Sequence, residues 1–170
     1  MNTIQKIFLI IIVFAFKICF AQNDNESRKA FTLKLSVDSI QFYQQEINKS
    51  KYFVKDNVLQ IYPGESLFIE AELNDNIISS MKVVKKNINP SKTIVVNFSQ
   101  NVSDRENKGM MLQVSNPFNS DLNYDAMMYI VGKNRWIKTS IIPIKPKLKN
   151  FEMWNDPIIT LVLNNWRLEK

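Results

Sequence analysis

Residues 67–73 read LFIEAEL, and this alternation of apolar and polar side chains sets the fold class. Every second residue, from Leu67 to Leu73, is apolar and would face one way, while Glu70 and Glu72 would face the other. Period-two alternation is typical of a β-strand that buries one face. The pattern recurs at 31–37 and 94–98, and we expect further strands at 51–61 (broken at Asp56-Asn57), 77–85, 110–115, 124–131, 136–144 and 158–168.

Turn-forming residues separate these ranges about every 8–12 residues, a spacing that favours a sandwich over a helical fold. We therefore predict an all-β, immunoglobulin-like antiparallel β-sandwich of about 8–9 strands over residues 30–170, with a closed barrel as the alternative. Range 124–131 is apolar on both faces, so we expect it inside a sheet or under a loop. Within 158–168, Leu161 and Leu163 are expected to be core residues. Range 40–50 fits helical and strand spacing alike.

The first 21 residues are typical of a secretory signal peptide. Lys6 precedes an apolar run over residues 7–16, and a small residue, Ala21, stands before a polar stretch. We predict cleavage between Ala21 and Gln22, a flexible leader over 22–29, and a periplasmic or secreted protein without a transmembrane anchor after processing. A retained anchor and lipid attachment at Cys19 are the alternatives, although the residues before Cys19 do not form a lipobox.

The amino-acid composition restricts which catalytic and metal-binding sites the protein can form. Among 170 residues there is no histidine, and the single cysteine, Cys19, would leave with the signal peptide. This composition excludes Ser-His and Cys-His catalysis and removes imidazole and thiolate metal ligands. We therefore expect no enzyme activity and no cofactor or metal. The formal net charge of +6 fits solubility as well as it fits an anionic partner.

These exclusions favour a non-catalytic exported module that binds a partner or has a structural role. We expect the partner to be an unknown protein or a glycan of the cell envelope, and not nucleic acid. Trp154 is the candidate contact residue, because it stands beside the turn Asn155-Asp156-Pro157 and an exposed indole can stack on a sugar or anchor a protein. The other interpretation is that Trp154 caps the core. A glycan-binding module is the alternative function.

Three further motifs each allow a functional and a structural interpretation. Glu70 and Glu72 could form the carboxylate pair of a polysaccharide hydrolase, or simply a polar strand face. Residues 121–125 have the oxygen spacing of a calcium loop but depart from the EF-hand pattern at Ala126, so they could equally shape a turn. The basic run Lys145–Lys149 could bind an anion, or protect a sheet edge from aggregation.

One resemblance concerns the C-terminal third of the chain. It rests on short motifs, which are Asn116-Pro117, Tyr124-Asp125-Ala126, Thr139-Ser140, Trp154, Pro157-Ile158 and Asn165-Trp166-Arg167-Leu168. With these motifs the chain resembles uncharacterised secreted β-sandwich proteins of bacteria. The resemblance implies an immunoglobulin-like sandwich outside the cytoplasm and carries no activity.

Overall fold

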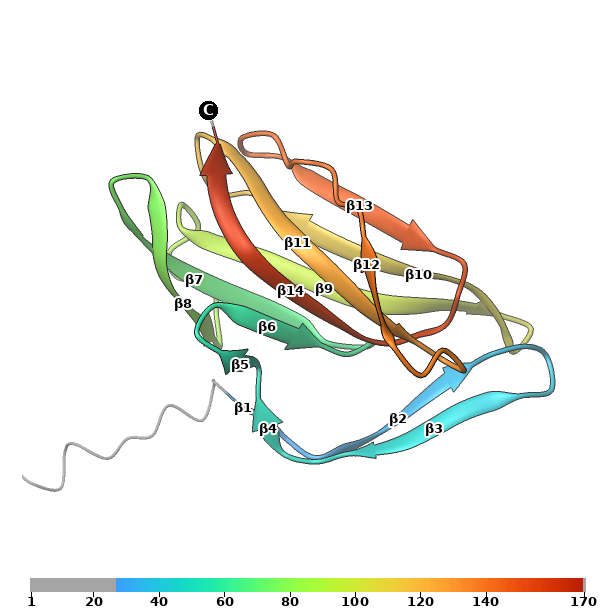
Figure 1. The fold of residues 1–170 in the computed structure, drawn as a ribbon. Coiled ribbons are helices and arrows are strands. Elements are labelled where there is room, and N and C mark those ends of the chain that lie inside the picture. Colours follow the sequence, from blue (N-terminus) through green and yellow to red (C-terminus); the bar gives the residue numbers. More distant parts are fainter. Residues whose placement is uncertain (1–26, 170) are drawn as a thin grey trace, which may run out of the picture.

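The computed structural model describes residues 27–169, and every regular element within them is a β-strand. Two five-stranded sheets form the body of the molecule (Figure 1). The first sheet has the order β13 (Lys149–Trp154), β10 (Glu106–Ser115), β9 (Thr93–Ser103), β7 (Ser66–Asn74) and β8 (Ile77–Val84). The second has the order β12 (Trp136–Thr139), β11 (Asp121–Ile130), β14 (Ile158–Glu169), β6 (Val58–Ile61) and β5 (Phe53–Lys55). All strand pairs are antiparallel.

The two sheets pack as a sandwich around one large apolar core. The alternating residues of β7 and β9 supply one wall, with Ile69 and Val96 fully buried. β14 supplies the opposite wall, where Leu161 and Leu163 are both 0 % exposed and pair with β6 and β11. The all-β sandwich prediction is confirmed, as is the prediction that these two leucines are core residues.

A hairpin of β2 (Phe31–Ser36) and β3 (Phe42–Ile47) lies along one end of the sandwich (Figure 1). Its inner face forms a second, smaller core in which Leu33, Leu35 and Ile47 pack against Ile159 of β14. The half-buried side chains against this small core include Tyr129 of β11. The prediction for 124–131 is thus confirmed, because β11 lies inside its sheet and the hairpin covers part of its outer face.

The strand count differs from the expected 8–9, since the described residues form fourteen strands. Two of the additional elements are very short, since β1 (Ser27–Arg28) pairs only with β4 (Ser50–Lys51). Strands of two residues are too short to show a period in the sequence. The edge strands β5 and β12 fall within the expected ranges 51–61 and 136–144, and β12 ends at Thr139, short of the expected residue 144. The expected break at Asp56-Asn57 is present, with Asp56 in the left-handed region at φ 40° between β5 and β6.

β13 is the one well-formed strand that the sequence analysis missed. Its exposed face carries Phe151 and Met153, which are 49 % and 64 % exposed, while the half-buried face carries Asn150 and Glu152. In most strands the apolar side chains face the core, whereas in β13 these two apolar side chains face outward. Because β13 is an edge strand paired only with β10, this inversion does not disturb the main core.

The folded part of the chain begins earlier than residue 30. Ser27 and Arg28, which the sequence placed in the flexible leader, form β1, and Arg28 is only 2 % exposed. Residues 1–26, which contain the predicted signal peptide and its cleavage site at Ala21 and Gln22, lie outside the described residues. Within residues 27–169, no helix is long and apolar enough to cross a membrane.

Candidate functional site

The most unusual polar side chain of the structure is Arg28, a buried arginine in the short strand β1. Its guanidinium donates to both carboxylate oxygens of Glu65, with the shorter contact, 2.8 Å, from Nε to Oε1. It also donates to the carbonyl of Gln60 at 2.6 Å and to Ser50 Oγ at 3.0 Å. Buried charges are tolerated only when they are paired and hydrogen-bonded, and Arg28 meets both conditions.

Two tyrosine rings enclose the same guanidinium. The Arg28 carbon Cζ lies 4.8 Å from the ring centre of Tyr52 and 4.9 Å from that of Tyr62, within the range of cation–π attraction. Burial raises the pKa of both phenols above the ordinary value. The cluster therefore holds β1 against the turn between β6 and β7 with one charge pair and two aromatic contacts.

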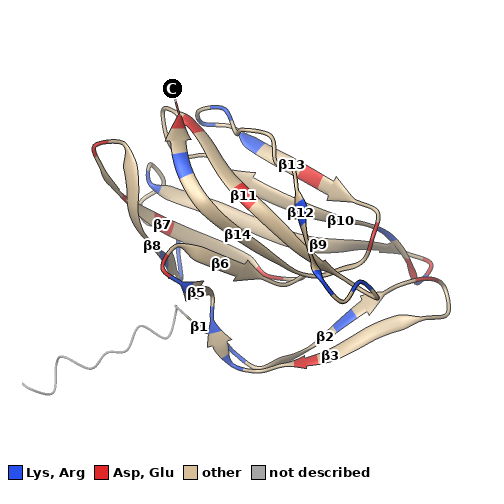
Figure 2. Cartoon of the chain, viewed as in Figure 1, with Lys and Arg blue, Asp and Glu red and all other residues tan. Residues whose placement is uncertain are grey.

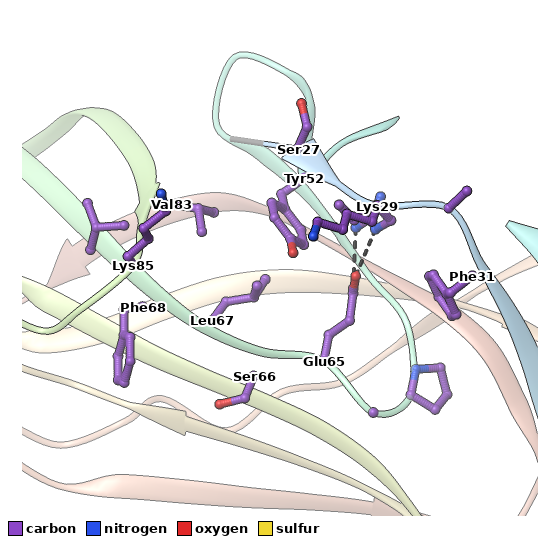
Figure 3. Close-up of a pocket in the computed structure, with 15 residues that line it drawn as sticks. Ser27, Lys29, Phe31, Tyr52, Glu65, Ser66, Leu67, Phe68, Val83 and Lys85 are labelled. Carbon is purple, nitrogen blue, oxygen red and sulfur yellow. Dashed lines mark hydrogen bonds and ion pairs between the residues drawn. The ribbon is translucent and has the colours of Figure 1, made fainter. Parts of the chain in front are cut away.

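Arg28 and Glu65 line a cleft with a volume of about 620 Å³. Its walls come from residues 27–31, from Tyr52, from 63–68 at the start of β7, and from 83–85 at the end of β8. Figure 3 shows Ser66 and Phe68 along one side, Val83 and Lys85 at one end, and Lys29 and Tyr52 across from β7. Clefts of this size are typical of small-ligand sites.

The charge of this cleft is positive. Lys29 and Lys85 are exposed at its rim, and neither forms an ion pair with an acidic residue of the described chain. Glu65 is the one acidic lining residue, and its carboxylate is occupied by Arg28 and by the backbone N–H of Tyr62 at 2.8 Å. Figure 2 shows further basic positions around β1, β4 and β5. The arrangement fits a negatively charged ligand better than a neutral or cationic one.

Glu70 and Glu72 lie on the outer face of β7, as expected, but a lysine joins them. Lys92 Nζ contacts Glu70 Oε1 at 3.0 Å and Glu72 Oε1 at 2.7 Å. Asn89 also donates to Glu70 Oε1 at 2.7 Å. The hydrogen bond from Lys92 is the main cause that lowers the pKa of Glu70, against a smaller opposing effect of burial. A carboxyl with a lowered pKa is a poor general acid at neutral pH.

This lowered pKa predicts an acid-dependent stability. A carboxyl whose pKa is lower in the folded state stabilises the fold fully above its unfolded pKa, about 4.5, and loses that contribution as the pH falls through the folded pKa. We expect Glu70→Gln to lower the melting temperature at pH 7 and to reduce the loss of melting temperature between pH 7 and about pH 3. Circular dichroism melts at both pH values measure this. Glu106→Gln, at an exposed carboxylate paired with Lys108, is the control, and equal acid sensitivity of all three proteins would contradict the prediction.

The two aspartates of residues 121–125, the range with the oxygen spacing of a calcium loop, also form ion pairs. Lys145 Nζ contacts Asp121 at 2.7 Å, and Arg167 Nη1 contacts Asp125 at 3.5 Å. Within residues 27–169, no group of three His, Cys, Asp or Glu side chains is placed to hold a metal ion. The contacts of the two aspartates are those of structural ion pairs along β11 and its neighbours.

The basic run Lys145–Lys149 lies where the chain passes from β12 to β13. Lys145 contacts Asp121, and Lys147, at φ 62°, donates from Nζ to the carbonyl of Pro117. Leu122 pairs with Ile144 as an isolated bridge, and the N–H of Asn116 donates to the carbonyl of Leu148. These contacts favour the structural interpretation of the run, at the edge of the sandwich.

Trp154 is half-buried at the end of β13 and packs against the main core. Its indole Nε1 donates to Thr139 Oγ1 of β12 at 3.1 Å, so it joins the two sheets at one edge. Trp166 is buried and stacks on Tyr124 at 4.7 Å between ring centres. Among the three tryptophans, Trp136 is the exposed one, at 42 %. The contacts of Trp154 favour a core role, and its proposed contact with a partner stays a prediction.

Sequence reasoning did not find the Arg28 cleft. Arg28 stands in a polar run that reads as a loose leader, and its main partner, Glu65, is 37 positions away. Tyr62 precedes the turn residues Pro63-Gly64, but nothing in the sequence brings it together with Tyr52 or Arg28. Comparisons with models of known protein families, with curated proteins and with solved structures gave no significant match.

Proposed function

We propose that this protein is an exported, non-catalytic binding module, and that the cleft beside Arg28 binds a negatively charged group of a partner outside the cytoplasm. The observation that carries the proposal is the pair of exposed lysines, Lys29 and Lys85, at the rim of a cleft whose single carboxylate is already paired. The signal-like residues 1–21 support export.

The pairing of the acidic side chains supports a binding role over hydrolysis. A glycosidase needs two carboxyl groups facing each other across a cleft, one of which acts as an acid. Glu65 lines the cleft alone and is held by Arg28, while Lys92 holds Glu70 and Glu72 on the outside of β7. A hydrolase would therefore require carboxylates other than those the cleft contains.

The finer assignment to an immunoglobulin-like topology is also a proposal. The chain crosses between the two sheets at β6–β7, β10–β11, β12–β13 and β13–β14, and such crossings are typical of Greek-key sandwiches. This supports a relation to immunoglobulin-like modules, which present loops and sheet edges for binding.

The charge of the cleft predicts a specific loss of anion binding. We expect Lys29→Glu with Lys85→Glu to weaken binding of fluorescein-labelled polyglutamate by about tenfold or more at low salt, because attraction becomes repulsion. Fluorescence anisotropy measures the affinity, which should fall for the parent as salt rises. Lys133→Glu with Lys138→Glu changes the net charge equally at exposed lysines outside the cleft, and should retain most of the affinity. Equal losses in the two double variants would contradict the proposal.

A glycan-binding role is the second candidate function. Trp136 is a better candidate than Trp154 for the residue that contacts the glycan, because Trp136 is the exposed tryptophan. The exposed Trp136 ring lies 5.3 Å from the Tyr129 ring across β11 and β12, so the two form an aromatic surface at the edge of the second sheet. Exposed aromatic rings of this kind stack on sugars. Trp136→Ala should abolish binding in a glycan array if this surface is used, and unchanged binding would remove the candidate.

A further inference from the structure

β7 extends past the end of its neighbour β8 at the floor of the cleft. The last pair between these strands is Phe68 with Val84, whereas β7 continues to pair with β9 as far as Ser66. Beyond Val84 the chain turns away from the sheet, where the N–H of Ile88 donates to the carbonyl of Lys86. The position in line with β8 and opposite Ser66 therefore has no strand in the described structure.

The backbone of Ser66 is directed toward this empty position. The N–H of Phe98 donates to the carbonyl of Glu65, and the N–H of Ala71 donates to the carbonyl of Lys92, so odd-numbered residues of β7 bond to β9. Because successive residues of a strand direct their peptide groups to opposite edges, Ser66 directs its N–H and C=O to the side of β8, as Phe68 does. Ser66 is exposed, and it lines the cleft.

The rest of the cleft complements an extended acidic chain. Lys29 lies across from β7 and Lys85 lies at the end of β8, so both cations flank the empty position (Figure 3). Phe68, half-buried, offers an apolar surface on the same strand. Tyr52 has one ring face against the Arg28 guanidinium, which leaves it less suited to stack on a sugar. A backbone donor and acceptor beside two cations fit a peptide better than a carbohydrate.

We propose that the cleft accepts an extended acidic segment of a partner protein, which adds to the first sheet as a continuation of β8 and pairs its backbone with Ser66. This inference rests on the proposed function, that the cleft binds an anionic partner. It adds the class of partner, which is a protein segment, and the binding mode, which is strand addition. Carboxylates of the segment contact Lys29 and Lys85, and its backbone supplies the hydrogen bonds at the sheet edge, as in other cases of strand addition.

The experiment compares two peptides that carry the same charges. The first is an EVEVEVE peptide with an acetylated N-terminus and an amidated C-terminus. The second has the same sequence, but every other backbone amide, on the edge that would pair with β7, is N-methylated. Strand addition predicts at least tenfold weaker binding of the methylated peptide by isothermal titration calorimetry. It also predicts at least tenfold slower hydrogen exchange of the Ser66 amide at saturating unmodified peptide, because that N–H becomes hydrogen-bonded.

The outcomes separate this inference from the function on which it rests. Equal affinity for the two peptides, with loss of both in the Lys29→Glu and Lys85→Glu variant, would overturn strand addition and retain the anion-binding cleft. Binding of an anionic oligosaccharide such as oligogalacturonate, without binding of either peptide, would also overturn it. Affinity unaffected by the lysine substitutions would overturn the proposed function as well.

Discussion

Replacing Glu65 by alanine is expected to destabilise the protein by about 3–5 kcal/mol, because it leaves the buried guanidinium of Arg28 without its counter-charge. The Arg28 side chain is 2 % exposed and that of Glu65 is 13 % exposed, so water cannot replace the lost carboxylate without rearrangement. Urea unfolding followed by tryptophan fluorescence measures the change in the free energy of unfolding.

Two controls test the cause of this loss. Glu106→Ala removes an exposed carboxylate that pairs with Lys108, and should cost at most about 1 kcal/mol. The double substitution Arg28→Met with Glu65→Leu should cost less than Glu65→Ala alone, since no buried charge is then left unpaired. A Glu65→Ala protein as stable as Glu106→Ala would show that the cluster does not hold β1 in place.

Leu161→Ala is the second large effect, with an expected cost of about 2–5 kcal/mol. Leu161 lies in β14, is 0 % exposed, and pairs with Ile61 on one side and Met128 on the other. Truncation removes buried apolar surface and leaves a cavity where the two sheets meet. Because total stability is typically about 5–15 kcal/mol, the variant could fail to accumulate at 37 °C.

Leu148→Ala is the matched control for this prediction. Leu148 is 59 % exposed in the segment before β13, so the same truncation should change the free energy of unfolding by less than about 0.5 kcal/mol. Thermal melts and urea titrations of both variants give the comparison. Equal melting temperatures for the two variants would mean that β14 is peripheral to the core.

Sequence reasoning worked best where burial repeats with a regular period. Range 158–168 corresponds to β14, and 67–73 corresponds to the centre of β7. Both ranges could be predicted because one face of each strand is buried and its apolar residues therefore alternate with others. The same reasoning placed β11 inside its sheet, since Met127 and Tyr129 make its second face apolar too. Periodicity reports local burial, and these strands are buried along most of their length.

The cleft could not be predicted in the same way, because its parts are brought together only by tertiary structure. Arg28, Tyr52 and Glu65 come from three separate segments, and the polar residues around Arg28 suggest exposure where the structure has burial. β13 was missed since its apolar side chains face outward. For Glu70 the sequence placed the carboxylate on the outer face of β7 correctly. It could not show that Lys92, the residue before β9, forms an ion pair with this carboxylate.

We propose that the cleft between β1 and β7 binds anionic partners. Titration of the ¹⁵N-labelled protein with hexaglutamate, followed by backbone amide shifts in heteronuclear spectra, tests it most directly. We expect the largest shifts at the cleft residues 27–31, 65–68 and 83–85, and we expect these shifts to saturate together. Largest shifts in the basic run 145–149, or uniform small shifts over the whole surface, would contradict it.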